Sequence, residues 1–105
     1  MKVSQWMAGI CLLGTLGVAQ AEARPDPDLA RNLAATCANC HGTNGQARGD
    51  LKPLAGMNAQ TIVAAMAGYK SGDVPATIMH QIAKGYTDEQ IKLVAAYFAA
   101  QPARK

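Results

Sequence analysis

Apolar positions recur at helical spacing along most of the chain after residue 28. Leu29, Leu33 and Cys37 follow one another every four residues, with alanines beside them, and this spacing predicts a helix with one apolar face. Asp28 comes directly before this face, and we expect it to cap the helix. The helix is expected to run into a pair of cysteines.

Two further helical segments follow a less regular stretch. Residues 42–57 contain four glycines and one proline and show no periodicity, which predicts a loop. Residues 58–69 predict a second helix, and residues 71–75 are expected to stop it. A shorter helical stretch is expected over residues 76–84, with Gly85 as its C-cap. The second helix places four residues on one apolar side: Ile62, Val63, Met66 and Tyr69.

The last helix has the clearest start. Thr87 and Gln90 have the spacing of a capping box, and two acidic residues between them suit the positive end of a helix. Pro102 lies beyond the expected end. No segment shows the pattern of a strand, so the sequence predicts an all-α fold. The stripe expected to be buried consists of Ile91, Val94, Ala95 and Phe98.

The first residues have a different character. Lys2 is followed by an apolar run over residues 6–19 and then by two A-x-A sequences that end at Ala21 and Ala23. This pattern predicts a secretory signal peptide over residues 1–23, cleaved after one of those alanines, with a single domain over residues 24–105. The alternative is an uncleaved anchor, but the run is shorter than the roughly 20 residues that a spanning helix needs. We expect a periplasmic protein without stable membrane insertion after cleavage.

Cys37, Cys40 and His41 form a C-x-x-C-H sequence, which is typical of the attachment of one covalent haem c. Two thiols one helical turn apart can both reach the same edge of a porphyrin, and the histidine that follows can bind its iron. The chain has 105 residues of which only 5% are aromatic, so a buried haem adds apolar volume to a modest core. A net charge of +3 is too weak to indicate a nucleic-acid partner.

Three other interpretations of the cysteine pair remain. A thioredoxin-like redox pair requires a neighbouring βαβ pattern, and a zinc site requires a second pair of ligands. The remaining cysteine, Cys11, lies in the predicted signal peptide. A disulfide between two such close cysteines closes too small a loop to stabilise the fold much.

The second axial ligand of the iron determines what such a protein does. We expect Met79, which is flanked by Ile78 and Ile82 as an apolar wall, and His80 is the main rival. Met66 has the position of a core residue and Met57 lies in the glycine-rich loop, so both are weaker candidates.

A backbone carbonyl is expected to hold the free ring nitrogen of His41, which fixes the orientation of the imidazole. The carbonyl of Pro53 is our candidate, because Pro53 lies in the loop that follows the C-x-x-C-H sequence.

The C-x-x-C-H sequence near the start of the mature chain, the later Met79 and the closing helix around Leu93 together resemble a class I bacterial cytochrome c. The resemblance covers the whole mature chain. It implies three to four helices around one covalently bound haem, with the first and last helices crossing near Ala34 and Tyr97.

A narrower resemblance covers residues 66–73 and 76–86, which are similar to the cytochrome subunit of flavocytochrome c sulfide dehydrogenases. It implies single-electron transfer, with Met79 as the axial ligand and an FAD-containing flavoprotein, or another redox protein, as partner. The protein is then an electron carrier and no enzyme on its own. A freestanding periplasmic shuttle is the alternative, and a haem-based ligand sensor with a labile sixth site is a third reading.

Overall fold

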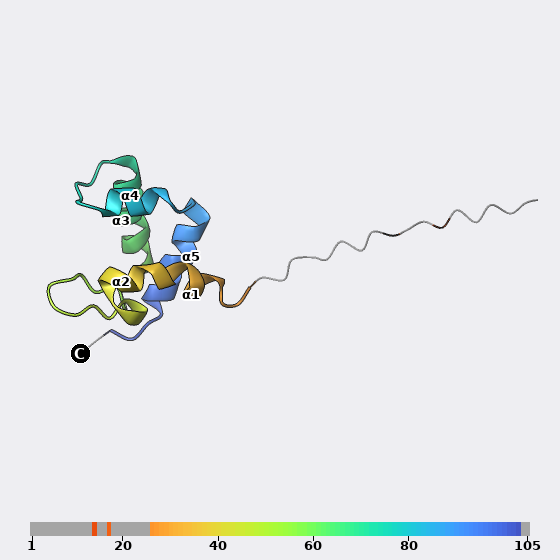
Figure 1. Cartoon of the computed structure of the whole chain (residues 1–105), viewed down its shortest axis with the longest axis horizontal. Coiled ribbons are helices and arrows are strands. Elements are labelled where there is room, and N and C mark those ends of the chain that lie inside the picture. Colours follow the sequence, from red (N-terminus) through yellow and green to blue (C-terminus); the bar gives the residue numbers. More distant parts are fainter. Residues whose placement is uncertain (1–13, 15–16, 18–25, 104–105) are drawn as a thin grey trace, which may run out of the picture.

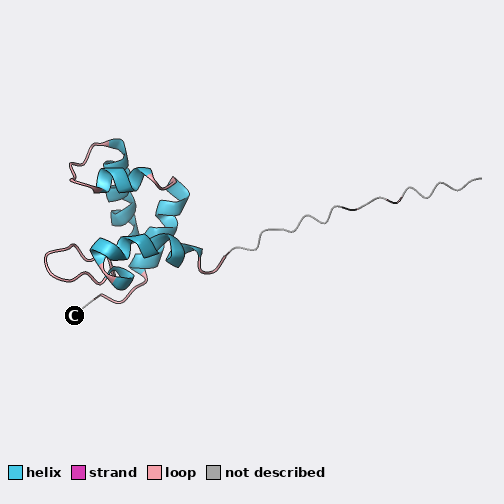
Figure 2. Ribbon diagram, viewed as in Figure 1, coloured by secondary structure: helices cyan, strands magenta, loops and turns pink. Residues whose placement is uncertain are grey.

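The computed structural model describes residues 14, 17 and 26–103 of the chain. Residues 26–103 contain helices, turns and loops but no strand (Figures 1 and 2), and this confirms the predicted all-α class. The signal peptide expected over residues 1–23, with its cleavage sites at Ala21 and Ala23, lies outside the described residues except for positions 14 and 17. The elements are α1 (Leu29–Ala34), η1 (Ala35–Cys37), α2 (Ala38–His41), η2 (Thr43–Gly45), α3 (Ala59–Ser71), α4 (Met79–Lys84) and α5 (Asp88–Ala99).

The first helical segment differs from the sequence prediction in two respects. It is divided into α1, the tighter turn η1 and α2 instead of forming one regular helix. The expected cap at Asp28 is also wrong, because this residue has right-handed helical backbone angles and its side chain caps no backbone N–H. Its carboxylate lies 3.3 Å from the guanidinium of Arg31 instead.

Helix α3 confirms the predicted second helix and has well-defined ends. The side chain of Asn58 accepts hydrogen bonds from the backbone N–H groups of Gln60 and Thr61, at 2.9 and 3.4 Å. At the other end Gly72 has a φ of 87°, which is the left-handed conformation that glycine adopts most easily.

The last two helices agree with the pattern to different degrees. Helix α4 begins at Met79 and not at residue 76, because Ile78 still has non-helical backbone angles. Gly85 ends α4 with ordinary right-handed angles, so the helix does not require a glycine conformation there. The predicted capping box of α5 is present: Thr87 accepts from the N–H of Gln90, and the side chain of Gln90 accepts from the N–H of Thr87.

The helices pack around one small core. Helix α5 contacts both α1 and α3, and α3 also contacts α4. In Figure 1, α2 and α4 lie on opposite sides of the domain, and α3 and α5 run between them. The core includes the complete stripe expected on the last helix, and its buried residues are Ala34, Ile62, Met66, Ala83, Ile91, Val94, Ala95 and Phe98.

The crossing of α1 and α5 agrees with the family resemblance. Ala34 is 3% exposed, and it lines a small hollow together with Tyr97 of α5. The hydroxyl of Tyr97 donates to the side chain of Asn44, and this hydrogen bond joins α5 to η2. Within the part of the chain that the structure describes, no helix is long and apolar enough to cross a membrane.

Candidate functional site

An apolar cavity of about 350 Å³ lies between the cysteine-bearing segment, α3, α4 and α5. It brings together most of the residues that sequence analysis singled out, although they come from distant parts of the chain. Its lining is formed by Thr36, Cys37, Cys40, His41, Leu51, Lys52, Leu54, Met57, Ile62, Ala65, Met66, Tyr69, Ile78, Met79, Ile82, Val94 and Phe98.

The two cysteines of the cavity differ in their surroundings. Both thiols are free, and Cys37 is partly buried while Cys40 is exposed. Burial raises the pKa of the Cys37 thiol above its usual value. Residues 26–103 hold no group of three or more His, Cys, Asp or Glu side chains that could bind a metal ion, so this part of the chain does not support the zinc interpretation.

The imidazole of His41 is held by the loop that follows it. Its Nδ1 atom lies 2.6 Å from the carbonyl oxygen of Lys52, and since a carbonyl only accepts, Nδ1 must be the donor. This tautomer leaves Nε2 with a free lone pair on the other side of the ring. The arrangement is the one expected of a metal-binding histidine whose orientation is fixed by a second hydrogen bond.

The expected acceptor, the carbonyl of Pro53, was wrong by one residue. Proline restricts the backbone here, because its ring fixes its own φ and the residue before it favours extended backbone. Of the two neighbouring carbonyls, the structure turns that of Lys52 toward the ring. The next residue, Leu54, is anchored by its N–H to the carbonyl of Gly45 at 2.8 Å, and this contact helps to set which of the two faces the ring.

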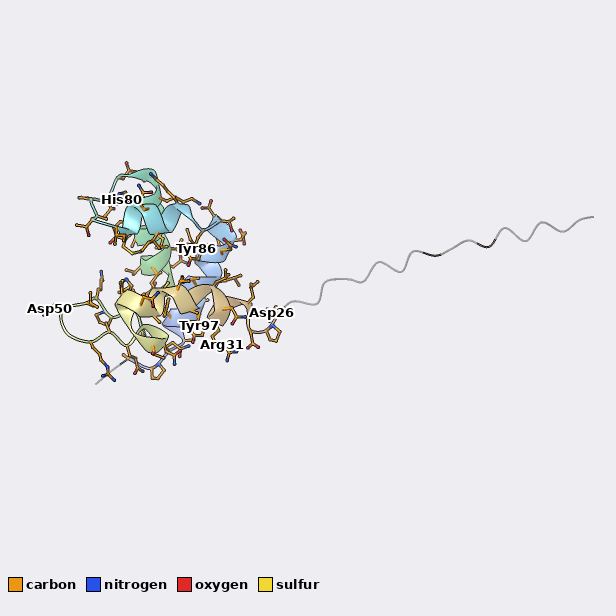
Figure 3. All side chains as sticks on the ribbon, in the orientation of Figure 1. Asp26, Arg31, Asp50, His80, Tyr86 and Tyr97 are labelled. Atoms are coloured by element: carbon orange, nitrogen blue, oxygen red, sulfur yellow. The ribbon has the colours of Figure 1, made fainter. Side chains whose placement is uncertain are left out.

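Four candidates for the second axial position occupy different environments. Met57, Met66 and Met79 all line the cavity, whereas His80 does not. Figure 3 places His80 on α4, away from the cysteine-bearing segment. The Nδ1 atom of His80 is buried and has no hydrogen-bond partner within the described part of the chain.

The surroundings of Met79 match the predicted apolar wall, because Ile78 and Ile82 both line the cavity beside it. Met66 is 9% exposed and belongs to the buried core, as its position on the second helix suggested. Ile78 is 56% exposed and Leu51 is 52% exposed, so these two side chains form an open rim.

Some residues of this site were not identified as site residues from the sequence. Tyr69 and Phe98 line the cavity, but the sequence indicated only that they lie on apolar helix faces, and Thr36 carries no signal at all. The role of the Lys52 carbonyl is equally hidden, because a backbone group has no sequence signature.

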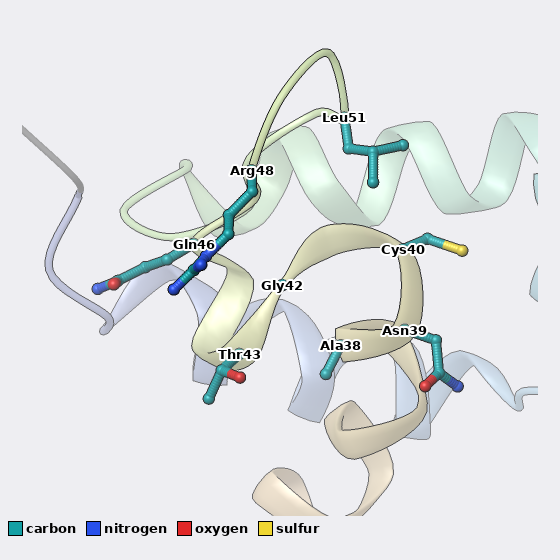
Figure 4. Close-up of a pocket in the computed structure, with 8 residues that line it drawn as sticks. All are labelled: Ala38, Asn39, Cys40, Gly42, Thr43, Gln46, Arg48 and Leu51. Carbon is teal, nitrogen blue, oxygen red and sulfur yellow. The ribbon is translucent and has the colours of Figure 1, made fainter.

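A second hollow, of about 380 Å³, lies on the other side of the cysteine-bearing turn. Figure 4 shows that the sulfur of Cys40 points away from Gln46 and Arg48, which line this hollow with several polar neighbours. His41 and Met79 do not line it, and the residues that it shares with the apolar cavity are Cys40 and Leu51.

The fold and the cavity define a small helical protein built to hold a covalently attached haem. The profile of the cytochrome c family matches residues 28–101. The chain belongs to the cytochrome c family and is a class I cytochrome, whose cofactor is covalently bound haem c. The residues fit this cofactor: two free thiols, a histidine with its second nitrogen engaged and a methionine-lined apolar wall meet in one cavity.

Three known cytochromes are similar to this chain in sequence or in structure. The cytochrome subunit of sulfide dehydrogenase from Chlorobaculum tepidum is 39% identical over 66 residues, which cover 63% of this chain and 60% of that protein. This chain therefore matches less than two thirds of that relative's length. Cytochrome c-554(548) of Halomonas halodenitrificans is 36% identical over 63% of this chain and 84% of its own length. A solved cytochrome c4 of Acidithiobacillus ferrooxidans has a TM-score of 0.61 and 32% identity, covering 69% of this chain and 49% of that one.

Proposed function

We propose that this chain is an exported single-haem electron carrier in which Cys37 and Cys40 bear the haem and His41 and Met79 bind its iron. The observation that carries the proposal is the common cavity, which receives all four side chains. When bound, haem c supplies a one-electron couple between Fe(III) and Fe(II).

The residues around the haem site influence the reduction potential of this couple. The carbonyl of Lys52 fixes His41 in one tautomer and one orientation, so that Nε2 is the ligating atom. A thioether from Met79 favours the reduced state more than a second imidazole does, and the apolar lining disfavours the extra charge of the oxidised state. Together these residues favour a carrier that accepts electrons readily.

Met79 is preferred to the other methionines for reasons of position. It is the first residue of α4, and α4 lies on the opposite side of the domain from α2, the helix that ends at His41 (Figure 1). Met57 belongs to the loop after His41 and is nearer in sequence to the histidine side. Met66 is part of the buried core, where it already has a packing role.

The proposed partner is the flavin-containing subunit of a sulfide-oxidising enzyme, from which this chain accepts electrons in the periplasm. The similarity to the Chlorobaculum tepidum subunit supports this, together with the sequence pattern of a signal peptide. The second candidate is a freestanding periplasmic shuttle. Its support is the similarity to cytochrome c-554(548), which this chain matches over most of that protein's length.

Affinity purification of the exported, haem-loaded protein from its native periplasmic extract separates the two candidates. A stable enzyme subunit co-elutes with a flavin absorption band, and sulfide then reduces its haem. A haem spectrum without flavin, in a fraction that sulfide does not reduce, contradicts the subunit and leaves the freestanding shuttle.

A further inference from the structure

We propose that Tyr86 is a positioning residue that holds the methionine-bearing side of the cavity against the cysteine-bearing side. It lies in the link between α4 and α5, and Figure 3 shows it between this link and the segment of α1 and α2. The proposal rests on the ligation by Met79 proposed above. Tyr86 does not line the cavity and so acts through other residues.

The side chain of Tyr86 reaches the cysteine-bearing segment. Its hydroxyl donates to the carbonyl of Leu33 at 3.3 Å and lies 2.6 Å from the hydroxyl of Thr36. A phenol has one proton to donate, so Thr36 must be the donor in the second bond. Thr36 directly precedes Cys37, and both line the cavity. The phenol therefore contacts the short turn from which the first thioether extends.

The backbone of Tyr86 is bonded to a different element, helix α3. Its carbonyl accepts a hydrogen bond of 2.7 Å from the ammonium group of Lys70, in the last turn of α3. The same ammonium lies 3.4 Å from the carboxylate of Asp88, in the first turn of α5. The side chain of Lys70 is 34% exposed, so the bond to the carbonyl is partly shielded from water.

These contacts matter because they join the α4 side of the domain directly to the cysteine-bearing segment. Met79 begins α4, and the segment before it, residues 71–78, is mostly exposed. Ala83 packs the middle of α4 into the core with no exposed surface. Within residues 26–103, no hydrogen bond other than those of the Tyr86 hydroxyl joins residues 29–41 to residues 79–88.

The physical consequence is a link across the cavity. Because Tyr86 directly follows Gly85, the C-cap of α4, movement of α4 as a rigid body away from the cysteine-bearing segment stretches or breaks the phenol bonds. Loss of one such bond shifts an equilibrium by roughly three- to tenfold. Tyr86 therefore favours the closed arrangement in which Met79 can stay on the iron.

The test uses the holoprotein and its variant Tyr86→Phe, which removes only the hydroxyl. Imidazole added to the oxidised protein binds the iron only after the methionine leaves, so its apparent affinity measures the fraction of protein that is open. We expect the apparent affinity for imidazole to rise about three- to tenfold in Tyr86→Phe. The methionine-to-iron charge-transfer band should disappear at correspondingly lower imidazole concentrations.

Tyr97→Phe is the matched control. It also removes a phenol hydroxyl that bonds a side chain, here Asn44, but it does so at the crossing of α1 and α5, away from the cavity lining. We expect a comparable loss of thermal stability with an unchanged affinity for imidazole. Lys70→Met breaks the backbone side of the link, and we expect it to raise the affinity as well, which keeps the proposal testable if Tyr86→Phe does not fold.

Two results overturn the proposal in distinguishable ways. A wild-type protein without the charge-transfer band contradicts methionine ligation itself, and the role of Tyr86 fails with it. A wild-type protein with the band, combined with an imidazole affinity in Tyr86→Phe that equals that of Tyr97→Phe, overturns only the role of Tyr86.

Discussion

The Nδ1 atom of His41 donates a hydrogen bond to the backbone carbonyl of Lys52, 2.6 Å away. This contact fixes the tautomer of the imidazole and directs Nε2 away from the loop. It also links the C-x-x-C-H turn to a backbone segment that proline restrains, since Pro53 follows Lys52 directly.

A first prediction concerns this restraint. Pro53→Gly gives the Lys52 carbonyl more freedom, so the imidazole becomes a poorer electron donor and the oxidised state loses stabilisation. We expect the reduction potential to rise by up to about 60 mV, which corresponds to one hydrogen bond in a one-electron couple. Spectroelectrochemical titration measures it.

Pro27→Gly provides the control for this measurement, because Pro27 lies in an exposed turn before α1. It makes the same change of residue without touching the His41 contact, and its potential should equal that of the wild type. Equal potentials in both variants contradict a tuning role for the Lys52 segment.

A second prediction concerns Gly45, which is buried and has a φ of 76°. A Cβ atom at this position meets the backbone nitrogen of Ala55 at 2.7 Å and the ring of Phe98 at 2.8 Å. Gly45→Ala therefore combines an unfavourable backbone conformation with overpacking, and we expect the free energy of unfolding to fall by about 2–5 kcal/mol. Chemical denaturation of the holoprotein gives this value.

Gly49 separates the two contributions, because it also has a positive φ, 66°, but no atom lies within 4 Å of an added Cβ. Gly49→Ala should lower the free energy of unfolding by about 1 kcal/mol through backbone conformation alone. If both variants lose the same stability, the close packing of Gly45 against Phe98 is not important.

A third prediction compares the two expected helix caps. Thr87→Ala removes the side chain of a complete capping box and should lower the free energy of unfolding by about 0.5–2 kcal/mol. Asp28→Ala removes no cap and only an exposed ion pair with Arg31, so we expect a loss below about 0.5 kcal/mol. Denaturation curves in which Asp28→Ala loses as much as Thr87→Ala would contradict this difference.

The caps show how far local sequence reasoning extends. The capping box of α5 and its buried stripe were predictable, because both depend on residues a few positions apart. Asp28 is a residue type as suitable for an N-cap as Thr87. However, it has right-handed helical backbone angles, and its carboxylate lies beside Arg31 instead of capping a backbone N–H. A residue type alone does not specify that conformation.

In the candidate site too, features set by local sequence were predictable and features set by distant contacts were not. The C-x-x-C-H sequence located Cys37, Cys40 and His41 because the chemistry requires fixed spacing, and the apolar flanks of Met79 were readable too. The acceptor for His41 was misplaced by one residue, because the direction of a loop carbonyl depends on distant anchoring. The contact between Thr36 and Tyr86 joins positions 50 residues apart, and no local pattern indicates it.

The most direct test of the proposed site is the visible absorption spectrum of oxidised Met79→Ala holoprotein, compared with Met66→Ala and Met57→Ala. We expect Met79→Ala to keep its covalent haem, lose the methionine-to-iron charge-transfer band and have a lower reduction potential. Met66→Ala should keep the band and lose stability, by about 2–5 kcal/mol for a core methionine. A Met79→Ala protein that retains the band, or a loss of the band in Met57→Ala instead, would contradict the assignment of Met79 as the axial ligand.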